Sequence, residues 1–122
     1  MRILNWERGC GKTTELVRIM MQPGNEDVVY VAPTYAQADY ALRVAERVFN
    51  NRREELPKEY LARFISASGL KSRMQSLLRD HKRLVIDELD GVLGALFGAE
   101  VLAVAGTCEP QKITAVAKET KN

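Results

Sequence analysis

The feature that most constrains the fold is a glycine-containing turn between a short apolar run and an amphipathic segment. Met1–Leu4 is the apolar run, Trp6–Thr14 contains the turn, and Thr14–Met21 carries apolar residues at helical spacing. A strand, a glycine-rich turn and a helix in this order are the context of a phosphate-binding loop. Gly9 and Gly11 would let the backbone approach phosphate oxygens, because glycine has no Cβ.

The residues of this loop have separate expected roles. Backbone N–H groups and the positive end of the following helix would hold a polyphosphate. Lys12 would reach the β- and γ-phosphates, and the Thr13 hydroxyl would bind Mg²⁺. The alternative is a plain glycine-containing loop with a solvated lysine, since Trp6 stands where the usual pattern begins with glycine. The predicted nucleotide-binding set in the loop is Arg8, Gly9, Cys10, Gly11, Lys12, Thr13 and Thr14.

A second motif begins at Leu84 and ends in two carboxylates. Leu84–Ile86 has the composition of a buried strand, and Asp87 and Glu88 follow it directly. Asp87 can hold Mg²⁺ through its water shell, because magnesium keeps several waters and takes few protein carboxylates. Glu88 can act as general base on an attacking water. The alternative is a pair of surface carboxylates that cap the next helix.

Two further residues are candidates for contacts with the phosphates. Arg8 lies three residues before Gly11 and could stabilise transition-state charge, which places it with Lys12 and Glu88 in the predicted catalytic set. Thr107 follows an apolar run, and its hydroxyl could contact the γ-phosphate or the attacking water. The alternatives are a solvated loop arginine and a simple turn after a strand, and the sequence leaves both open.

Apolar runs and amphipathic segments alternate along the 122 residues, which predicts one α/β domain over residues 1–122. We expect a three-layer α/β/α sandwich of the P-loop NTPase type, with a mainly parallel sheet of about five strands. Leu70, Met74, Leu77 and Leu78 would form the buried face of one helix. The expected strands are Arg2–Asn5, Val28–Ala32, Arg63–Ser66, Leu84–Ile86, Val101–Ala105 and an edge strand Ile113–Ala117, for which a helical tail is the alternative. The expected helical segments are Lys12–Met21, Tyr35–Phe49 with Thr34 as N-cap, Lys58–Ala62, Ser68–Asp80 and Val92–Phe97.

Composition sets few limits on function. Hydrophobic residues make up 46% and charged residues 28%, as in an ordinary globular protein, and the net charge of +2 allows a nucleic-acid partner without requiring one. No apolar run approaches the roughly 20 residues that span a bilayer, so no membrane association is expected. Cys10 and Cys108 lack a metal-binding spacing, which favours the reducing cytoplasm.

Four stretches together resemble the ATPase core of phage terminase large subunits, the motors that package DNA. Arg8–Thr14 resembles their variant Walker A motif, and Leu84–Glu88 resembles Walker B with its catalytic glutamate. Val31–Ala38 is similar to the segment after their second strand, and Val104–Thr107 to their coupling motif. The resemblance implies ATP and Mg²⁺ as cofactors, double-stranded DNA as a partner, a homo-oligomeric ring or larger packaging assembly, and host cytoplasm if the chain is phage-encoded.

The chain also departs from terminases. Almost nothing precedes Trp6 where they have an adenine-contacting segment, and residues up to Asn122 offer no acidic nuclease cluster, so DNA cutting is not predicted. One alternative is a non-catalytic nucleotide-binding regulator of a larger motor. Another is a nucleoside kinase, because Gly11–Leu16 is similar to the loop of thymidine kinases, although two cysteines cannot build their four-cysteine zinc site.

Overall fold

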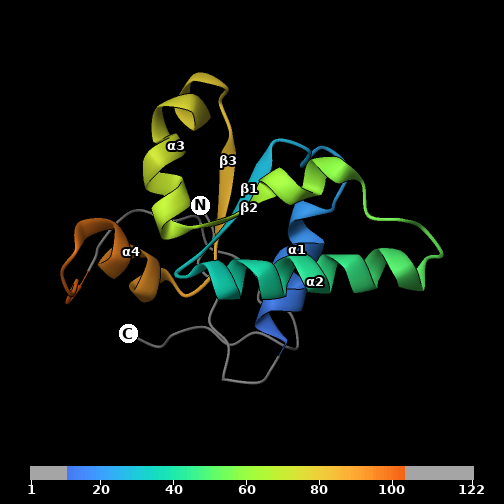
Figure 1. Ribbon diagram of the computed structural model, residues 1–122, viewed down its shortest axis with the longest axis horizontal. Coiled ribbons are helices and arrows are strands. Elements are labelled where there is room, and N and C mark those ends of the chain that lie inside the picture. The colour runs from blue at the N-terminus through green and yellow to red at the C-terminus, as the bar shows by residue number, and fades with distance from the viewer. Residues whose placement is uncertain (1–10, 104–122) are drawn as a thin grey trace, which may run out of the picture. The chain divides into compact units, whose positions relative to one another are not determined.

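The central element of the computed structural model is strand β1, Val28–Ala32. The structure describes residues 11–103, and Thr13–Val101 form one compact unit. In it β1 pairs in parallel with β2, Phe64–Ser66, on one side and with β3, Arg83–Ile86, on the other (Figure 1). All five residues of β1 are buried, as expected for a β-branched run with strands on both edges. The sequence prediction of a mixed α/β fold is confirmed at this level.

Helices cover both faces of the three strands. Successive residues of a strand point to opposite faces of the sheet, so β1 contributes apolar side chains to two separate cores. Val28, Tyr30 and Ala32 share one core cluster with α1, Lys12–Met20, and α2, Tyr35–Asn51. Val29 and Val31 share the other with α3, Ala67–Arg79, and α4, Leu89–Phe97. Figure 1 shows α1 and α2 on one side of the strands, with α3 and α4 on the other. The connection between α2 and β2 contains a 3₁₀ helix, η1, at Lys58–Arg63.

The start of α2 follows the prediction from sequence. Thr34 is its N-cap, and the Thr34 hydroxyl accepts a hydrogen bond from the Gln37 backbone N–H at 3.2 Å. The same hydroxyl donates to the Gln37 side-chain oxygen Oε1 at 3.0 Å, so two hydrogen bonds join Thr34 to Gln37. The Thr34 side chain therefore serves to begin the helix directly after β1.

Two expectations about burial are wrong. Met74 and Leu78 are 42% and 71% exposed, because the side of α3 that meets the sheet is defined by Ala67, Leu70 and Leu77. Strand β3 is only partly buried, with Leu84 41% exposed, since β3 has a strand neighbour on one side only within residues 11–103.

The run predicted as strand Val101–Ala105 lies only partly within the described residues. Residues 101–103 form no strand, and the remainder of that run lies outside the described residues. The predicted strands Arg2–Asn5 and Ile113–Ala117 also lie outside them. Across residues 11–103, no helix has the length and apolar character needed to cross a membrane.

One arginine joins three segments at the end of the sheet where β1 begins. Arg63 donates through Nε to the Val28 carbonyl at 2.9 Å, and through Nη2 to the carbonyls of Met20 and Asn25 at 3.0 and 2.8 Å. Its guanidinium carbon lies 4.6 Å from the centre of the Tyr60 ring. Arg63 therefore ties the last residue of α1 and the following loop to the first residue of β1.

Replacing Arg63 by lysine should destabilise the fold, because a point-charge ammonium cannot reproduce three hydrogen bonds in a fixed planar geometry. We expect Arg63→Lys to lower the free energy of unfolding by about 1–3 kcal/mol, measured by urea denaturation. Arg43→Lys is the matched control, since Arg43 is exposed and makes only ion pairs within α2. It should change stability by less than about 0.5 kcal/mol. Equal effects of the two substitutions would contradict the role given to Arg63.

A second arginine fixes the same end of the sheet from β3. Arg83 contacts Asp27 through two hydrogen bonds of 2.7 Å, and also donates to the Gly24 carbonyl at 2.9 Å. The hydrogen bond from Arg83 is the main reason that the pKa of Asp27 falls from 3.8 to about 2. The charged form of Asp27 is therefore favoured by folding.

This depressed pKa predicts a pH-dependent contribution of Asp27 to stability. Because the folded-state pKa is below the unfolded value, the contribution should be complete above pH 3.8 and should disappear as the pH falls towards 2. Urea denaturation of wild type and Asp27→Asn from pH 6 to pH 2 measures it. The wild type should be the more stable protein at pH 6, and the difference should shrink through the window from about 4 to 2. A constant difference across that window would rule out the ionic pair as its source.

Candidate functional site

Thr13 and Asp87, 74 positions apart in sequence, meet at one end of the parallel sheet. The Thr13 hydroxyl donates to the Asp87 carboxylate oxygen Oδ2 at 3.1 Å. Thr13 is in the first turn of α1, and Asp87 directly follows β3. The structure therefore brings together the two residues that sequence reasoning assigned to Mg²⁺.

The register of the sheet explains why the Asp87 side chain faces α1. Val85 is paired with Tyr30, and both contribute to the core cluster shared with α1 and α2. Asp87 lies two residues beyond Val85, so its side chain projects to the same face. The Asp87 backbone N–H donates to the Val31 carbonyl at 2.9 Å, which continues the pairing with β1 beyond the end of β3.

Tyr30 is a site residue that sequence reasoning missed. Its hydroxyl donates to Asp87 Oδ2 at 2.5 Å, and its side chain is fully buried. Burial, followed by this hydrogen bond to a carboxylate, raises the pKa of the Tyr30 hydroxyl well above its ordinary value, so the hydroxyl keeps its proton. The sequence did contain one sign of this role, because Tyr30 is the single hydroxyl-bearing residue within the apolar run Val28–Ala32.

Asp87 is buried, which argues against the alternative of two surface carboxylates. It is 7% exposed and is the one charged residue among the buried positions of residues 11–103. A carboxylate is removed from water at a large cost unless it accepts strong hydrogen bonds or binds a cation. The hydroxyls of Thr13 and Tyr30 supply two such hydrogen bonds.

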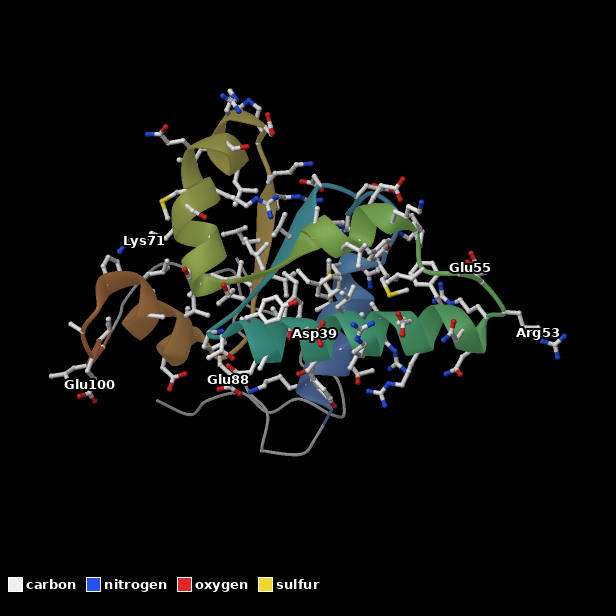
Figure 2. The ribbon with its side chains drawn as sticks, viewed as in Figure 1. Asp39, Arg53, Glu55, Lys71, Glu88 and Glu100 are labelled. Carbon is white, nitrogen blue, oxygen red and sulfur yellow. The ribbon has the colours of Figure 1, made fainter. Side chains whose placement is uncertain are left out.

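Glu88 differs from its neighbour in both backbone and exposure. It lies in the left-handed region, with φ 55° and ψ 66°, and its side chain is exposed. Glu88 occupies the N-cap position of α4, but its side chain makes no capping hydrogen bond there. Helix capping by the side chain therefore does not explain why a glutamate stands at this position. Figure 2 shows Glu88 at the end of the sheet from which α2 and α4 begin. Strained backbone of this kind is found at catalytic sites more often than elsewhere.

The start of α4 lies unusually close to the segment after β1. A Cβ added to Gly91 would be 2.9 Å from Cγ and 3.2 Å from Cβ of Pro33. Glycine is therefore required for α4 to approach Pro33 this closely. This contact fixes the direction of the chain directly after Glu88, between the ends of β3 and β1.

The remaining predicted site residues fall into two groups. Gly11 has φ 75°, a conformation that glycine adopts without strain, and Lys12 begins α1 immediately after it. Thr14 is half-buried in the first turn of the same helix. Four predicted site residues lie outside the described residues: Arg8, Gly9, Cys10 and Thr107.

The pair formed by Thr13 and Asp87 fits a magnesium ion chemically. A threonine hydroxyl that donates its one proton to a carboxylate keeps its oxygen lone pairs for a cation. Mg²⁺ binds through one or two protein oxygens together with waters and phosphate oxygens, so it does not need a dense carboxylate cluster. Residues 11–103 contain no group of three or more His, Cys, Asp or Glu side chains placed to hold a metal.

No protein-family model matches the chain, and no curated protein or solved structure shows significant similarity to it.

The left-handed backbone of Glu88 predicts that glycine at this position gives a more stable protein than alanine, the reverse of the usual order within a helix. Both Glu88→Ala and Glu88→Gly remove the side chain, but only glycine adopts this conformation without a Cβ clash. We expect Glu88→Gly to be more stable than Glu88→Ala by about 1 kcal/mol, because the left-handed conformation costs a residue with a Cβ roughly 1–2 kcal/mol. Urea denaturation of both variants measures the difference.

The same pair of substitutions at Gln75 is the control, since Gln75 is exposed within α3. There alanine should be the more stable by about 0.8–1.0 kcal/mol, the usual difference within a helix. The same sign at both positions would mean that Glu88 is not held in the left-handed region.

Proposed function

We propose that this chain is a Mg²⁺-dependent ATPase with the P-loop fold, a three-layer α/β/α sandwich whose mainly parallel sheet has about five strands. The observation that carries the proposal is the 3.1 Å hydrogen bond between the Thr13 hydroxyl and the Asp87 carboxylate. It joins the residue after Gly11-Lys12 at the start of a helix to the carboxylate at the end of a parallel strand. A Walker A threonine and a Walker B aspartate need this proximity to share one metal ion.

The chain's own residues divide the expected work. Backbone N–H groups at the start of α1 hold phosphate oxygens, and Lys12 balances their charge. Thr13 and Asp87 hold Mg²⁺, which neutralises charge that develops on the β- and γ-phosphates. Arg8, three residues before Gly11, is proposed to add positive charge at the phosphates, and Thr107 to contact the γ-phosphate.

Glu88 is proposed as the general base that takes a proton from the attacking water. Its exposed side chain contrasts with the buried carboxylate of Asp87, so the two adjacent acids are suited to different tasks. A general base must reach a water molecule, whereas a metal-holding carboxylate gains from a fixed, desolvated position. The turn at Glu88 produces this separation within two residues.

The type of ATPase is proposed from the sequence motifs. Arg8–Thr14, Val31–Ala38, Leu84–Glu88 and Val104–Thr107 resemble those of phage terminase ATPase cores, which favours a DNA-translocating motor. We therefore propose double-stranded DNA as the partner and a ring or larger packaging assembly as the working form, in the cytoplasm of the host cell.

The test separates binding from chemistry with two substitutions. Lys12→Ala should abolish binding of a fluorescent ATP analogue, because Lys12 supplies positive charge to the phosphates. Glu88→Gln keeps the shape of the side chain and removes its charge, so binding should remain near wild type. Its single-turnover rate of phosphate release should fall by about 10²–10⁴-fold, the usual contribution of a positioned general base.

Glu55→Gln is the matched control, since Glu55 is exposed in the segment between α2 and η1 (Figure 2). It should release phosphate at the wild-type rate, with and without DNA. If wild type and Glu88→Gln release phosphate equally fast, the ATPase assignment fails. Retained Mg²⁺-dependent binding in that case would leave the nucleotide-binding regulator as the function.

A further inference from the structure

Tyr30 stands out among the residues of β1 because it alone carries a polar side-chain group. The other four residues are valines and an alanine, and all five are buried between two strands and two layers of helices. A buried hydroxyl is costly unless it is hydrogen-bonded. A phenylalanine would fill nearly the same space without that requirement, so packing alone gives no reason for the hydroxyl.

The Tyr30 ring is held firmly enough to direct its hydroxyl. The ring centre lies 5.3 Å from that of Phe64, which is paired with Tyr30 in the neighbouring strand. Tyr30 has no exposed surface, and its ring is enclosed by the core cluster that includes α1 and α2. The direction of the hydroxyl is therefore set by the sheet and its helices.

The hydroxyl of Tyr30 and the backbone of Val31 attach Asp87 to β1 at two points. The Val31 carbonyl accepts from the Asp87 backbone N–H at 2.9 Å, and the Tyr30 hydroxyl donates to Asp87 Oδ2 at 2.5 Å. Thr13 donates to the same oxygen from α1. A carboxylate fixed at its backbone and at one oxygen has little freedom to rotate.

We propose that Tyr30 is a positioning residue that orients the Asp87 carboxylate for Mg²⁺, so that the affinity for the metal depends on a hydroxyl in the neighbouring strand. This inference rests on the proposed function, because it takes Asp87 as the residue that holds the metal. Hydrogen-bond partners of metal-holding groups orient them, and their loss typically costs about 10–100-fold in metal affinity.

The experiment measures the Mg²⁺ dependence of nucleotide binding, with a fluorescent ATP analogue that cannot be hydrolysed. In Tyr30→Phe, the Mg²⁺ concentration that gives half-maximal binding should rise by about tenfold or more. Binding at saturating Mg²⁺ should return to the wild-type level, because the residues of the loop are untouched. A purely structural role would lower the melting temperature without moving the Mg²⁺ midpoint.

Tyr60→Phe is the matched control, since it removes the same atom from a tyrosine that packs against the same core cluster. The Tyr60→Phe variant should show the wild-type Mg²⁺ concentration for half-maximal nucleotide binding. If wild type itself binds no nucleotide with Mg²⁺, the proposed function fails. If wild type binds and Tyr30→Phe has an unchanged Mg²⁺ midpoint, the inference about Tyr30 is wrong while the proposed function stands.

A second measurement on the wild-type protein covers the case in which Tyr30→Phe does not fold. The four tyrosines can be labelled with ¹³C at the carbon that bears the hydroxyl. Phenylalanine substitutions at the other three tyrosines assign the signal of Tyr30 by elimination. Adding Mg²⁺ to the nucleotide-loaded protein should shift the Tyr30 signal and leave that of Tyr60 in place. An unmoved Tyr30 signal would overturn the inference.

Discussion

The burial of β1 on both faces and both edges is the constraint on which the rest of the described structure depends. Parallel pairing with β2 and β3 gives every residue of β1 a place in one of two cores. Parallel pairing also brings the carboxyl ends of β1 and β3 together. Asp87 follows β3, and its backbone N–H donates to the Val31 carbonyl. The candidate site therefore lies at the carboxyl ends of these two strands. In open α/β sheets, ligands bind at this end of the strands.

The opposite end of the sheet contributes to the site through the rigidity of α1. Arg63 ties the carbonyl of Met20, the last residue of α1, to the start of β1. An α-helix of nine residues is a rod about 13 Å long. Fixing one end of that rod against β1 also limits where its other end, with Thr13, can lie. A structural arginine far from Asp87 thereby helps to hold the Thr13 hydroxyl within hydrogen-bond distance of it.

Much of the described fold could be predicted because its elements are short and sharply bounded. The β-branched run Val28–Ala32 and the capping residue Thr34 leave few other interpretations, and both are confirmed. The exposure of Met74 and Leu78 could not be predicted, since a single sequence shows an apolar stripe without showing how wide a surface it meets. The hydrogen bond from Tyr30 to Asp87 could not be predicted for a related reason. A tyrosine within a buried strand is usually a packing residue, and its partner Asp87 is 57 positions away.

The contrast between Asp87 and Glu88 shows how two adjacent acids reach different environments. An extended strand would alternate them between the two faces of the sheet, where helices would cover both. The left-handed turn at Glu88 interrupts that alternation one residue after the end of pairing with β1. The approach of Gly91 to Pro33 then directs α4 back across the end of β1. Asp87 consequently stays inside with Tyr30, while Glu88 faces water, so the two adjacent acids suit the different tasks proposed for them.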